Sequence, residues 1–243
     1  MTGRVAIITG AANGLGLACA ARLAADGYRL GLVDMADGAL AKAAASREEQ
    51  GAPVIALTTD IRTREACTAA VRAVAERFGR VDVLVNAAGV YPRKPVLDIA
   101  ADDWQLVFQV NVLGTYFMMV EAIEAMRGTG GGRIVNVSSI DGFKAHPANA
   151  HYAATKAAVI SLTRSMALEV APLGILVNSV APGPMATETA KRSDWYEPMV
   201  AGLPTRTPIE PGEIANVVAF LAAEANVSMA GENVIVSGGA VIV

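Results

Sequence analysis

A glycine-rich loop between a short apolar run and a helical segment constrains the fold of this chain more than any other feature. Residues 5–8 are wholly apolar, residues 9–16 contain three glycines, and apolar positions then recur at helical spacing until Gly27. A strand, a tight loop and a helix in this order are typical of the first unit of a parallel α/β sheet. The start of the chain therefore predicts a sheet whose strands are linked through helices.

The same alternation continues along the chain. Apolar runs typical of buried strands are separated by alanine-rich segments, at residues 5–8, 30–33, 54–57, 81–85, 134–137, 175–180 and 234–236. Such continuous apolar strands suit a parallel sheet that is covered on both faces. Because crossovers between parallel strands are right-handed, we expect a doubly wound Rossmann-type α/β fold. With 243 residues and no low-complexity tract, we expect one domain over residues 1–243.

Charge and composition argue against several classes of function. A net charge of -3 and the lack of a basic run leave no electrostatic case for nucleic-acid binding. We find no apolar stretch of signal-peptide or membrane-spanning length, so we expect a cytoplasmic protein without a membrane partner. Cys19 and Cys67 fall in predicted helices as small buried residues. His146 and His151 lack a suitable ligand cluster, so we expect surface or pocket-rim positions and no metal site.

The glycine-rich loop is predicted to bind the pyrophosphate of a dinucleotide. Glycines let the backbone approach the phosphates closely, and the free N–H groups at the start of the helix face their charge. The alternative is a tight turn without a ligand, which the order of strand, loop and helix makes less attractive. The residues predicted to contact the cofactor here are Gly10, Asn13, Gly14, Leu15 and Gly16.

An acidic residue ends the second predicted strand. Asp34 lies about 20 residues beyond the loop, where the adenosine ribose is expected. Its carboxylate can accept hydrogen bonds from both ribose hydroxyls and would repel a 2′-phosphate. No Lys or Arg lies in the loop or at residues 35–37 to offset this repulsion, although Lys42 and Arg4 could approach in the fold. Asp34, with Met35 beside it, therefore favours NAD over NADP, and the alternative for Asp34 is a strand-end turn residue.

The segment Tyr152-Ala153-Ala154-Thr155-Lys156 places a phenol and an ammonium on one face of a helix. A unit charge at ~4 Å with an effective dielectric of about 20 is worth ~4 kcal/mol, or roughly three pKa units. Lys156 is therefore predicted to bring the pKa of Tyr152 from about 10 toward neutrality. Such a tyrosine can exchange the proton of an alcohol, which is half of interconverting an alcohol and a carbonyl. The alternative is a solvated pair that arises by chance.

Taken together, these motifs resemble the short-chain dehydrogenases/reductases, from about Arg4 to Gly239. The resemblance implies seven strands and further cofactor contacts. It places the adenine at Asp60 and Ile61 and the nicotinamide carboxamide at Pro182, Gly183, Met185 and Thr187. It also implies cofactor contacts from the segment after the fourth strand, at Asn86, Ala87, Ala88 and Gly89. Ala87 stands where the family has a second asparagine, so the resemblance does not supply the side-chain bond that normally braces the central sheet.

The resemblance also implies a catalytic set. Ser139 precedes Tyr152 by the family's interval and would donate a hydrogen bond to the substrate oxygen, whereas the adjacent Ser138 would be structural. Tyr152 would exchange the proton. Lys156, together with the positive charge of oxidised nicotinamide, would lower the pKa of Tyr152, and Lys156 would also hydrogen-bond the nicotinamide ribose. Asn111 would help to place a water in a proton relay through its backbone carbonyl.

Two helical segments carry more apolar surface than one sheet face requires. Residues 106–126 are apolar nearly all round, and residues 153–170 are rich in Ala and Ser. Deep burial within one chain is the alternative. The family commonly forms tetramers through the corresponding helices, so we expect a homo-oligomer and favour a tetramer. The tail at 240–243 is a further candidate contact, and Ser237, which replaces the family's Asp, is expected to affect only the tail.

Substrate-lining residues are expected after Ser139, after Gly89 and on the segment 187–211, which we expect to form a lid. The candidates are Tyr91, Asp141, Phe143, His146, Trp195, Tyr196 and Met199. Aromatic and thioether side chains favour a mainly apolar or aromatic secondary alcohol or ketone as the small-molecule partner. Packing of the lid against itself is the alternative for each residue.

The sequence therefore predicts an NAD-dependent oxidoreductase that interconverts a secondary alcohol and a ketone by hydride transfer, with Tyr152 as general acid and base. A 3-oxoacyl-(acyl-carrier-protein) reductase is an alternative within the same class, although that group usually prefers NADPH and basic docking patches. A dinucleotide-sensing protein without catalysis is a third hypothesis. Such proteins tend to lose the Tyr or Lys, whereas the set of Asn111, Ser139, Tyr152 and Lys156 is intact here.

Overall fold

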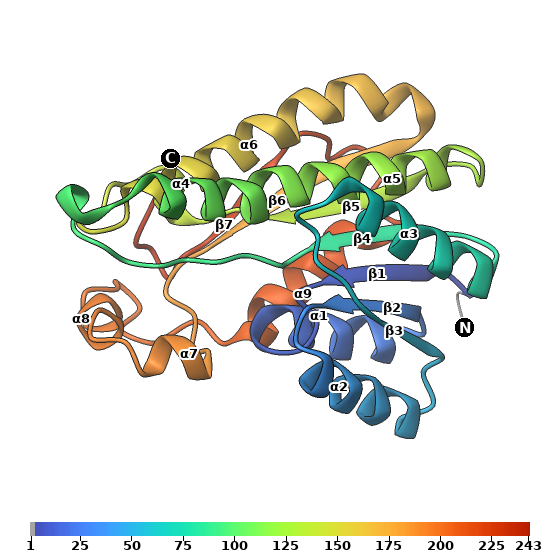
Figure 1. Ribbon diagram of the computed structural model, residues 1–243, viewed down its shortest axis with the longest axis horizontal. Coiled ribbons are helices and arrows are strands. Elements are labelled where there is room, and N and C mark those ends of the chain that lie inside the picture. Colours follow the sequence, from blue (N-terminus) through green and yellow to red (C-terminus); the bar gives the residue numbers. More distant parts are fainter. Residues whose placement is uncertain (1–2) are drawn as a thin grey trace.

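A parallel sheet of seven strands runs through the computed structural model, which describes residues 3–243 (Figure 1). The strand order is β3-β2-β1-β4-β5-β6-β7, and its direction reverses between β1 and β4, as in a doubly wound sheet. The strands are β1 (Val5–Thr9), β2 (Arg29–Asp34), β3 (Val54–Thr58), β4 (Val83–Asn86), β5 (Gly132–Val137), β6 (Ile175–Pro182) and β7 (Asn233–Val236). The predicted Rossmann-type α/β fold with seven parallel strands is confirmed.

Helices cover both faces of this sheet (Figure 1). One face carries α1 (Gly14–Ala25), α2 (Asp37–Glu49) and α9 (Pro211–Ala222), and the other carries α3 (Arg64–Phe78), α4 (Ala101–Phe108), α5 (Thr115–Arg127) and α6 (Ala150–Val170). Two short helices, α7 (Glu188–Lys191) and α8 (Tyr196–Ala201), follow β6 and lie to one side of the sheet. The segment between β6 and α9 therefore stands apart from both helical layers.

The strands are continuous apolar runs because alternate side chains enter two different cores. In β1, Val5 and Ile7 belong to the core that contains α3 and α5, whereas Ala6 and Ile8 belong to the core that contains α1 and α9. All four side chains are fully buried. A strand covered on both faces has no position left for a solvated side chain, which explains the pattern in the sequence.

The most apolar helical segment is longer than the sequence predicts. Between α4 and α5 the backbone continues as a π-helical stretch, Gln109–Gly114, so that one helix runs from Ala101 to Arg127. By length and composition this helix could cross a membrane, so the expectation of no apolar stretch of that length was wrong. The helix packs against α3 and strands β4, β5 and β6, and Met118, Met119 and Met126 are fully buried. These contacts are those of a core helix.

The burial of both cysteines agrees with the sequence prediction, whereas the burial of His151 does not. Cys19 and Cys67 are buried free thiols, as predicted, and burial raises the pKa of each to about 12. His151 is fully buried, with its ring 6.1 Å from that of Trp104, so the predicted surface or rim position was wrong. The reason is that α6 begins at Ala150, which turns His151 toward α4.

Candidate active site

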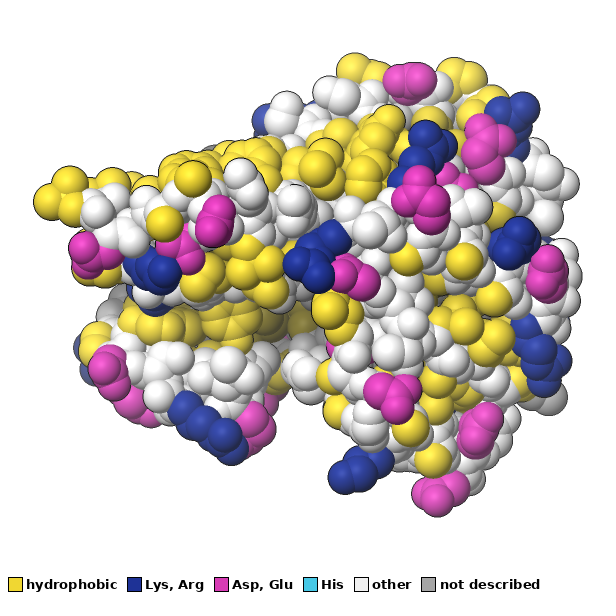
Figure 2. All heavy atoms as spheres, in the orientation of Figure 1, with side chains coloured by type: hydrophobic (Ala, Val, Ile, Leu, Met, Phe, Trp, Pro, Cys, Tyr) yellow, Lys and Arg dark blue, Asp and Glu magenta, His cyan; other side chains and the backbone are white. Residues whose placement is uncertain are grey.

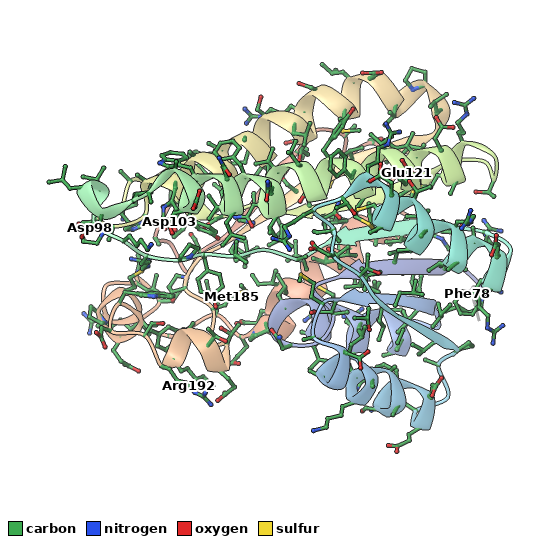
Figure 3. All side chains as sticks on the ribbon, viewed as in Figure 1. Phe78, Asp98, Asp103, Glu121, Met185 and Arg192 are labelled. Carbon is green, nitrogen blue, oxygen red and sulfur yellow. The ribbon has the colours of Figure 1, made fainter. Side chains whose placement is uncertain are left out.

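A cavity of about 640 Å³ lies where the strands end at their carboxyl edge. Residues from the glycine-rich loop, from the ends of β2 and β6, from the segment after β4 and from α7 line it. Figure 2 shows the molecule hollowed between its upper and lower parts, with hydrophobic side chains on the floor of the hollow. Met185, labelled in Figure 3, lies in this space, and it is one of the lining residues.

The glycine-rich loop passes very close to the segment after β4. Gly10 has φ +66°, and a Cβ at this position would lie 2.8 Å from the backbone of Ala88. A Cβ at Gly16 would lie 2.0 Å from the carbonyl oxygen of Gly10. Only glycine fits either position, so the loop can place its N–H groups at the surface of the cavity. This cradle suits a pyrophosphate, and all five predicted loop residues line the cavity.

Thr9 ties the end of β1 to the segment after β4. Its fully buried hydroxyl accepts hydrogen bonds from the N–H groups of Ala87 and Ala88, both at 3.1 Å. Both alanines line the cavity, so this side chain fixes the wall beside the glycine-rich loop.

Replacing Thr9 by valine is expected to lower the free energy of unfolding by about 1–3 kcal/mol, because two N–H groups lose their acceptor while the shape is kept. Urea unfolding followed by far-ultraviolet circular dichroism measures the change. The matched control is Thr58→Val, since Thr58 is exposed and donates a single hydrogen bond to Asp37. Equal free energies of unfolding for Thr9→Val and the unmodified protein would show that Thr9 does not stabilise the segment after β4.

The carboxylate of Asp34 is held at the mouth of the cavity by two backbone N–H groups. One oxygen accepts from Ala12 and the other from Ala36, each at 3.0 Å. Asp34 and Met35 both line the cavity. Asp60 and Ile61 also line it, and a hydrogen bond from Arg62 holds the pKa of Asp60 below its usual range. The predicted adenosine contacts are thus gathered on one side of the cavity.

Asn86 braces the sheet although Ala87 lacks the family's second amide. The Asn86 amide donates to the side-chain oxygen of Asn136 at 2.9 Å, and the Asn136 amide donates to the hydroxyl of Thr163 at 3.0 Å. This chain of bonds links β4, β5 and α6. Asn86 is buried and is not a lining residue of the described cavity, so its side chain supports the wall from within the sheet.

Ser139, Tyr152 and Lys156 meet at one end of the cavity. The ammonium of Lys156 lies 5.6 Å from the centre of the Tyr152 ring and donates to the carbonyl of Val137 at 2.8 Å. Ser139 and Tyr152 line the cavity, and a hydrogen bond between them lowers the pKa of the phenol. Ser138 instead donates to the carbonyl of Val180, so it faces away from the cavity as expected.

The pKa of Tyr152 does not move in the direction that the sequence predicts. Burial raises it above its ordinary value, the Asp141 carboxylate raises it further, and the hydrogen bond with Ser139 only partly opposes the rise. Burial also lowers the pKa of Lys156 to about 8. The expectation that Lys156 by itself brings the phenol near neutrality was therefore wrong, because it left out the desolvation of both groups.

Asn111 lies behind Lys156, inside the π-helical stretch. Its side-chain oxygen accepts from the N–H of Val90, and its amide donates to the Val90 carbonyl and to the hydroxyl of Thr155. A Cβ on Gly89 would lie 3.3 Å from this oxygen and 3.7 Å from the Lys156 nitrogen. The side chain of Asn111 thus joins the segment after β4 to α6, which places it beside the pair predicted to be catalytic.

Four of the seven predicted substrate residues line the cavity: Tyr91, Asp141, Trp195 and Met199. The Tyr91 ring meets that of Tyr152 edge-on, with centroids 6.2 Å apart. The other three lie elsewhere. Phe143 lines a second cavity beside α6 and the end of the chain. Tyr196 packs with Ala186 and Ala190. His146 is hydrogen-bonded to Asp141 and does not itself line the described cavity.

Arg93 is a lining residue that the sequence analysis missed. Its guanidinium lies over the ring of Trp195, 4.6 Å from the centroid, and contacts the sulfur of Met199 at 3.9 Å. The available signal was its place two residues after Tyr91, on a loop already expected to line the substrate pocket. Asn149 also lines the cavity, donates to Asp141 at 2.6 Å, and was not predicted from the sequence.

Comparison with known proteins agrees with this geometry. A family model described as short chain dehydrogenase matches residues 4–197. Over 249 residues the chain is 36% identical to trans-4-hydroxycyclohexanecarboxylate dehydrogenase of Sinomonas cyclohexanicum, which covers 97% of this chain and 92% of the relative. Over 245 residues it is 33% identical to a 3-oxoacyl-(acyl-carrier-protein) reductase of Synechocystis sp., with coverages of 100% and 98%. An NAD+-bound xylitol dehydrogenase superposes with a TM-score of 0.93 at 35% identity, over 98% of both chains.

The chain therefore belongs to the short-chain dehydrogenase/reductase family. It is an oxidoreductase, and the family to which it belongs binds a nicotinamide dinucleotide. The relatives that it matches include dehydrogenases that act on alcohols.

Proposed function

We propose that this protein is an NAD-dependent oxidoreductase that interconverts a secondary alcohol and a ketone, with Tyr152 as general acid and base. The observation that carries the proposal is the meeting of Ser139, Tyr152 and Lys156 at the end of a cavity whose other end is the glycine-rich cradle. Hydride and proton must be exchanged at adjacent atoms of the substrate, and this cavity is continuous from the dinucleotide cradle to the phenol.

Each side chain has a defined task in this reaction. The Ser139 hydroxyl donates to the substrate oxygen and stabilises the negative charge that grows there. Tyr152 gives a proton to that oxygen during reduction and takes it during oxidation. Lys156, held by the Val137 carbonyl, keeps a cation beside the phenol, and Asn111 fixes the segment behind it. A dinucleotide held by the glycine-rich loop would supply or accept the hydride, and its oxidised form would add a second positive charge near the phenol.

We propose NAD rather than NADP as the cofactor, because no Lys or Arg of residues 3–243 lines the cavity beside Asp34 to receive a 2′-phosphate. Of the described residues that line the cavity, only Arg93 is a cation, and it stacks on Trp195, at the substrate end. A fixed carboxylate close to a 2′-phosphate would repel it.

We expect kcat/KM with NAD to exceed kcat/KM with NADP by about 10- to 100-fold, since hydrogen bonds to a charged group are worth about 1.5–3 kcal/mol. Steady-state rates with both cofactors measure this ratio. Asp34→Ser should bring the ratio close to one, whereas Asp37→Ser should keep it, because Asp37 bonds Thr58 outside the cavity. A preference for NADP in the unmodified protein would reject the proposed role of Asp34.

The second candidate is a 3-oxoacyl-(acyl-carrier-protein) reductase, which the Synechocystis relative favours. That activity needs a carrier protein as partner. Asp34 and the lack of a basic docking patch in the sequence argue against it. Rates of NADH and NADPH oxidation with a 3-oxoacyl thioester, beside simple ketones, separate the two candidates.

We propose that the chain is one catalytic domain in which residues 187–211, holding α7 and α8, close over the substrate.

We further propose a cytoplasmic homo-oligomer, with a tetramer favoured. Its support is apolar surface on the long helix and on α6, where Trp104, Leu106, Leu113 and Tyr116 are exposed and Leu168 is 83% exposed. Ser237 bonds both backbone groups of Val241 and so shapes the tail, whose last two residues are exposed.

The proposed activity is tested by incubating the protein with NAD and a panel of secondary alcohols, sugars and hydroxysteroids, and by following the nicotinamide absorbance band. Formation of NADH with a secondary alcohol supports the proposal. Oxidation of primary alcohols alone would reject the assigned substrate class.

A further inference from the structure

Arg93 gives the substrate end of the cavity a positive charge that no carboxylate of the described chain neutralises. It forms no ion pair within residues 3–243. Its only polar contact there is with the sulfur of Met199, and the ring of Trp195 supports its flat face. A guanidinium stacked in this way is fixed in direction while its N–H groups stay free to bind an anion.

The carboxylates that line the cavity are all engaged elsewhere. Asp34 accepts from two backbone N–H groups, Asp60 pairs with Arg62, Asp141 is bonded by His146 and Asn149, and Glu188 pairs with Lys191. The charge of Arg93 is therefore left for something that enters the cavity. One free guanidinium among four acidic residues suits a singly charged carboxylate better than a doubly charged phosphate.

Arg93 lies at the reacting end of the cavity and not at the cofactor cradle. It follows Tyr91 by two residues, and the Tyr91 ring packs edge-on against that of Tyr152. Burial and Asp141 raise the pKa of the Tyr152 phenol, and the charge of Arg93 opposes a small part of this rise. Figure 1 shows the loop after β4, in green, running from the sheet to the start of α4 above α7 and α8. Arg93 belongs to this loop, and its contact with Trp195 joins the loop to the segment 187–211.

We propose that Arg93 binds a carboxylate on the substrate, so that the natural substrates are hydroxy acids or oxo acids whose carboxylate is separated from the reacting carbon. A guanidinium binds a carboxylate through two parallel hydrogen bonds, and this would fix which carbon faces the hydride. The inference rests on the proposed oxidoreductase function and adds the substrate class.

The test compares oxo acids with their methyl esters, which keep the shape and remove the charge. Acetoacetate, 4-oxopentanoate, 5-oxohexanoate and 4-oxocyclohexanecarboxylate vary the distance from carbonyl to carboxylate. For each acid and ester, kcat/KM with NADH is measured in the unmodified protein, Arg93→Met and Arg93→Lys. The matched control is Lys94→Met, because Lys94 pairs with Asp103 of α4 at 2.7 Å and does not line the described cavity.

For at least one acid we expect kcat/KM to exceed that of its ester by about 10- to 100-fold. This ratio should fall to near one in Arg93→Met, fall only partly in Arg93→Lys, and stay unchanged in Lys94→Met. Binding is measured separately by calorimetric titration of the NAD+-loaded protein with each oxo acid and ester, where no hydride can be transferred.

Several outcomes would overturn the inference. Esters reduced as fast as acids throughout, or a ratio that survives Arg93→Met, would exclude the carboxylate site and leave the oxidoreductase function standing. Acids that bind no better than esters would exclude the site as well. Conversely, acid-selective binding that Arg93→Met abolishes, without turnover of any compound, would support the carboxylate site and count against the proposed reaction.

Discussion

Replacing Tyr152 by phenylalanine is expected to lower kcat by about 100- to 10,000-fold, because a positioned general acid or base contributes that much to a proton transfer. The ring stays, and with it the edge-on packing against Tyr91 at 6.2 Å, so the binding of NADH should change little. Steady-state turnover gives kcat, and the protein fluorescence quenched by NADH gives the dissociation constant. Loss of turnover with NADH binding retained is the expected pair of results.

The matched control for this substitution is Tyr116→Phe. Tyr116 lies on α5, is 40% exposed and does not line the described cavity. Its phenol should make no difference to kcat. Turnover in Tyr152→Phe within a few-fold of the unmodified protein would contradict the acid-base role, and so would an equal loss in both variants.

Replacing Lys156 by methionine is expected to reduce turnover by at least about 10-fold while making the protein more stable at neutral pH. Burial lowers the pKa of Lys156 from 10.5 to about 8, and the residue is only 6% exposed. Such a shift corresponds to about 3 kcal/mol against the charged form. The lost hydrogen bond to Val137 offsets part of this, so we expect a net gain of about 1–2 kcal/mol in the free energy of unfolding.

The gain in stability should depend on pH. Below pH 8, Lys156 is protonated in both the folded and the unfolded chain, and the folded protein carries the full desolvation penalty. Between about pH 8 and 10.5 the folded lysine has released its proton while the unfolded one retains it, so the unmodified protein becomes more stable as pH rises. The advantage of Lys156→Met should therefore be full at pH 7 and shrink across this window.

Urea unfolding at pH 7 and at about pH 9.5 measures this change. Lys42→Met is the control, because Lys42 is exposed on α2 and its replacement should alter stability little at either pH. A Lys156→Met protein that is less stable than the unmodified protein at pH 7 would show that the ammonium is not held against a desolvation penalty.

The fold could be predicted from the sequence because buried parallel strands leave a direct signature. Val5 to Ile8 are apolar without interruption because both faces of β1 are covered, and each of the seven strands was located to within a few residues. The cofactor cradle was equally visible, since Gly10 and Gly16 stand where a side chain would collide with the backbone. Both features are local in the sequence.

What the sequence did not predict depends on contacts between distant segments. Phe143 was placed in the substrate pocket by its distance from Ser139, but the turn after η3 (Ile140–Gly142) directs it to the other side of α6. His151 was expected at the surface or the pocket rim because it lacks a ligand cluster, but the start of α6 at Ala150 buries it beside Trp104. The pKa of Tyr152 depends on the burial of the whole site and on Asp141, which a four-residue spacing cannot reveal. The position of the Arg93 guanidinium is set by its contact with Trp195, about 100 residues away in the sequence.

The central claim is that the bound dinucleotide and Lys156 together make the Tyr152 phenol acidic, although burial alone holds its pKa above the ordinary value. The most direct measurement is the pKa of this phenol, obtained from the difference in tyrosinate absorbance between the unmodified protein and Tyr152→Phe, each titrated with and without NAD+. We predict a pKa well below 10 with NAD+ bound, and a higher one in Lys156→Met with NAD+. A phenol that still titrates above 10 in the NAD+ complex would contradict the proposed mechanism.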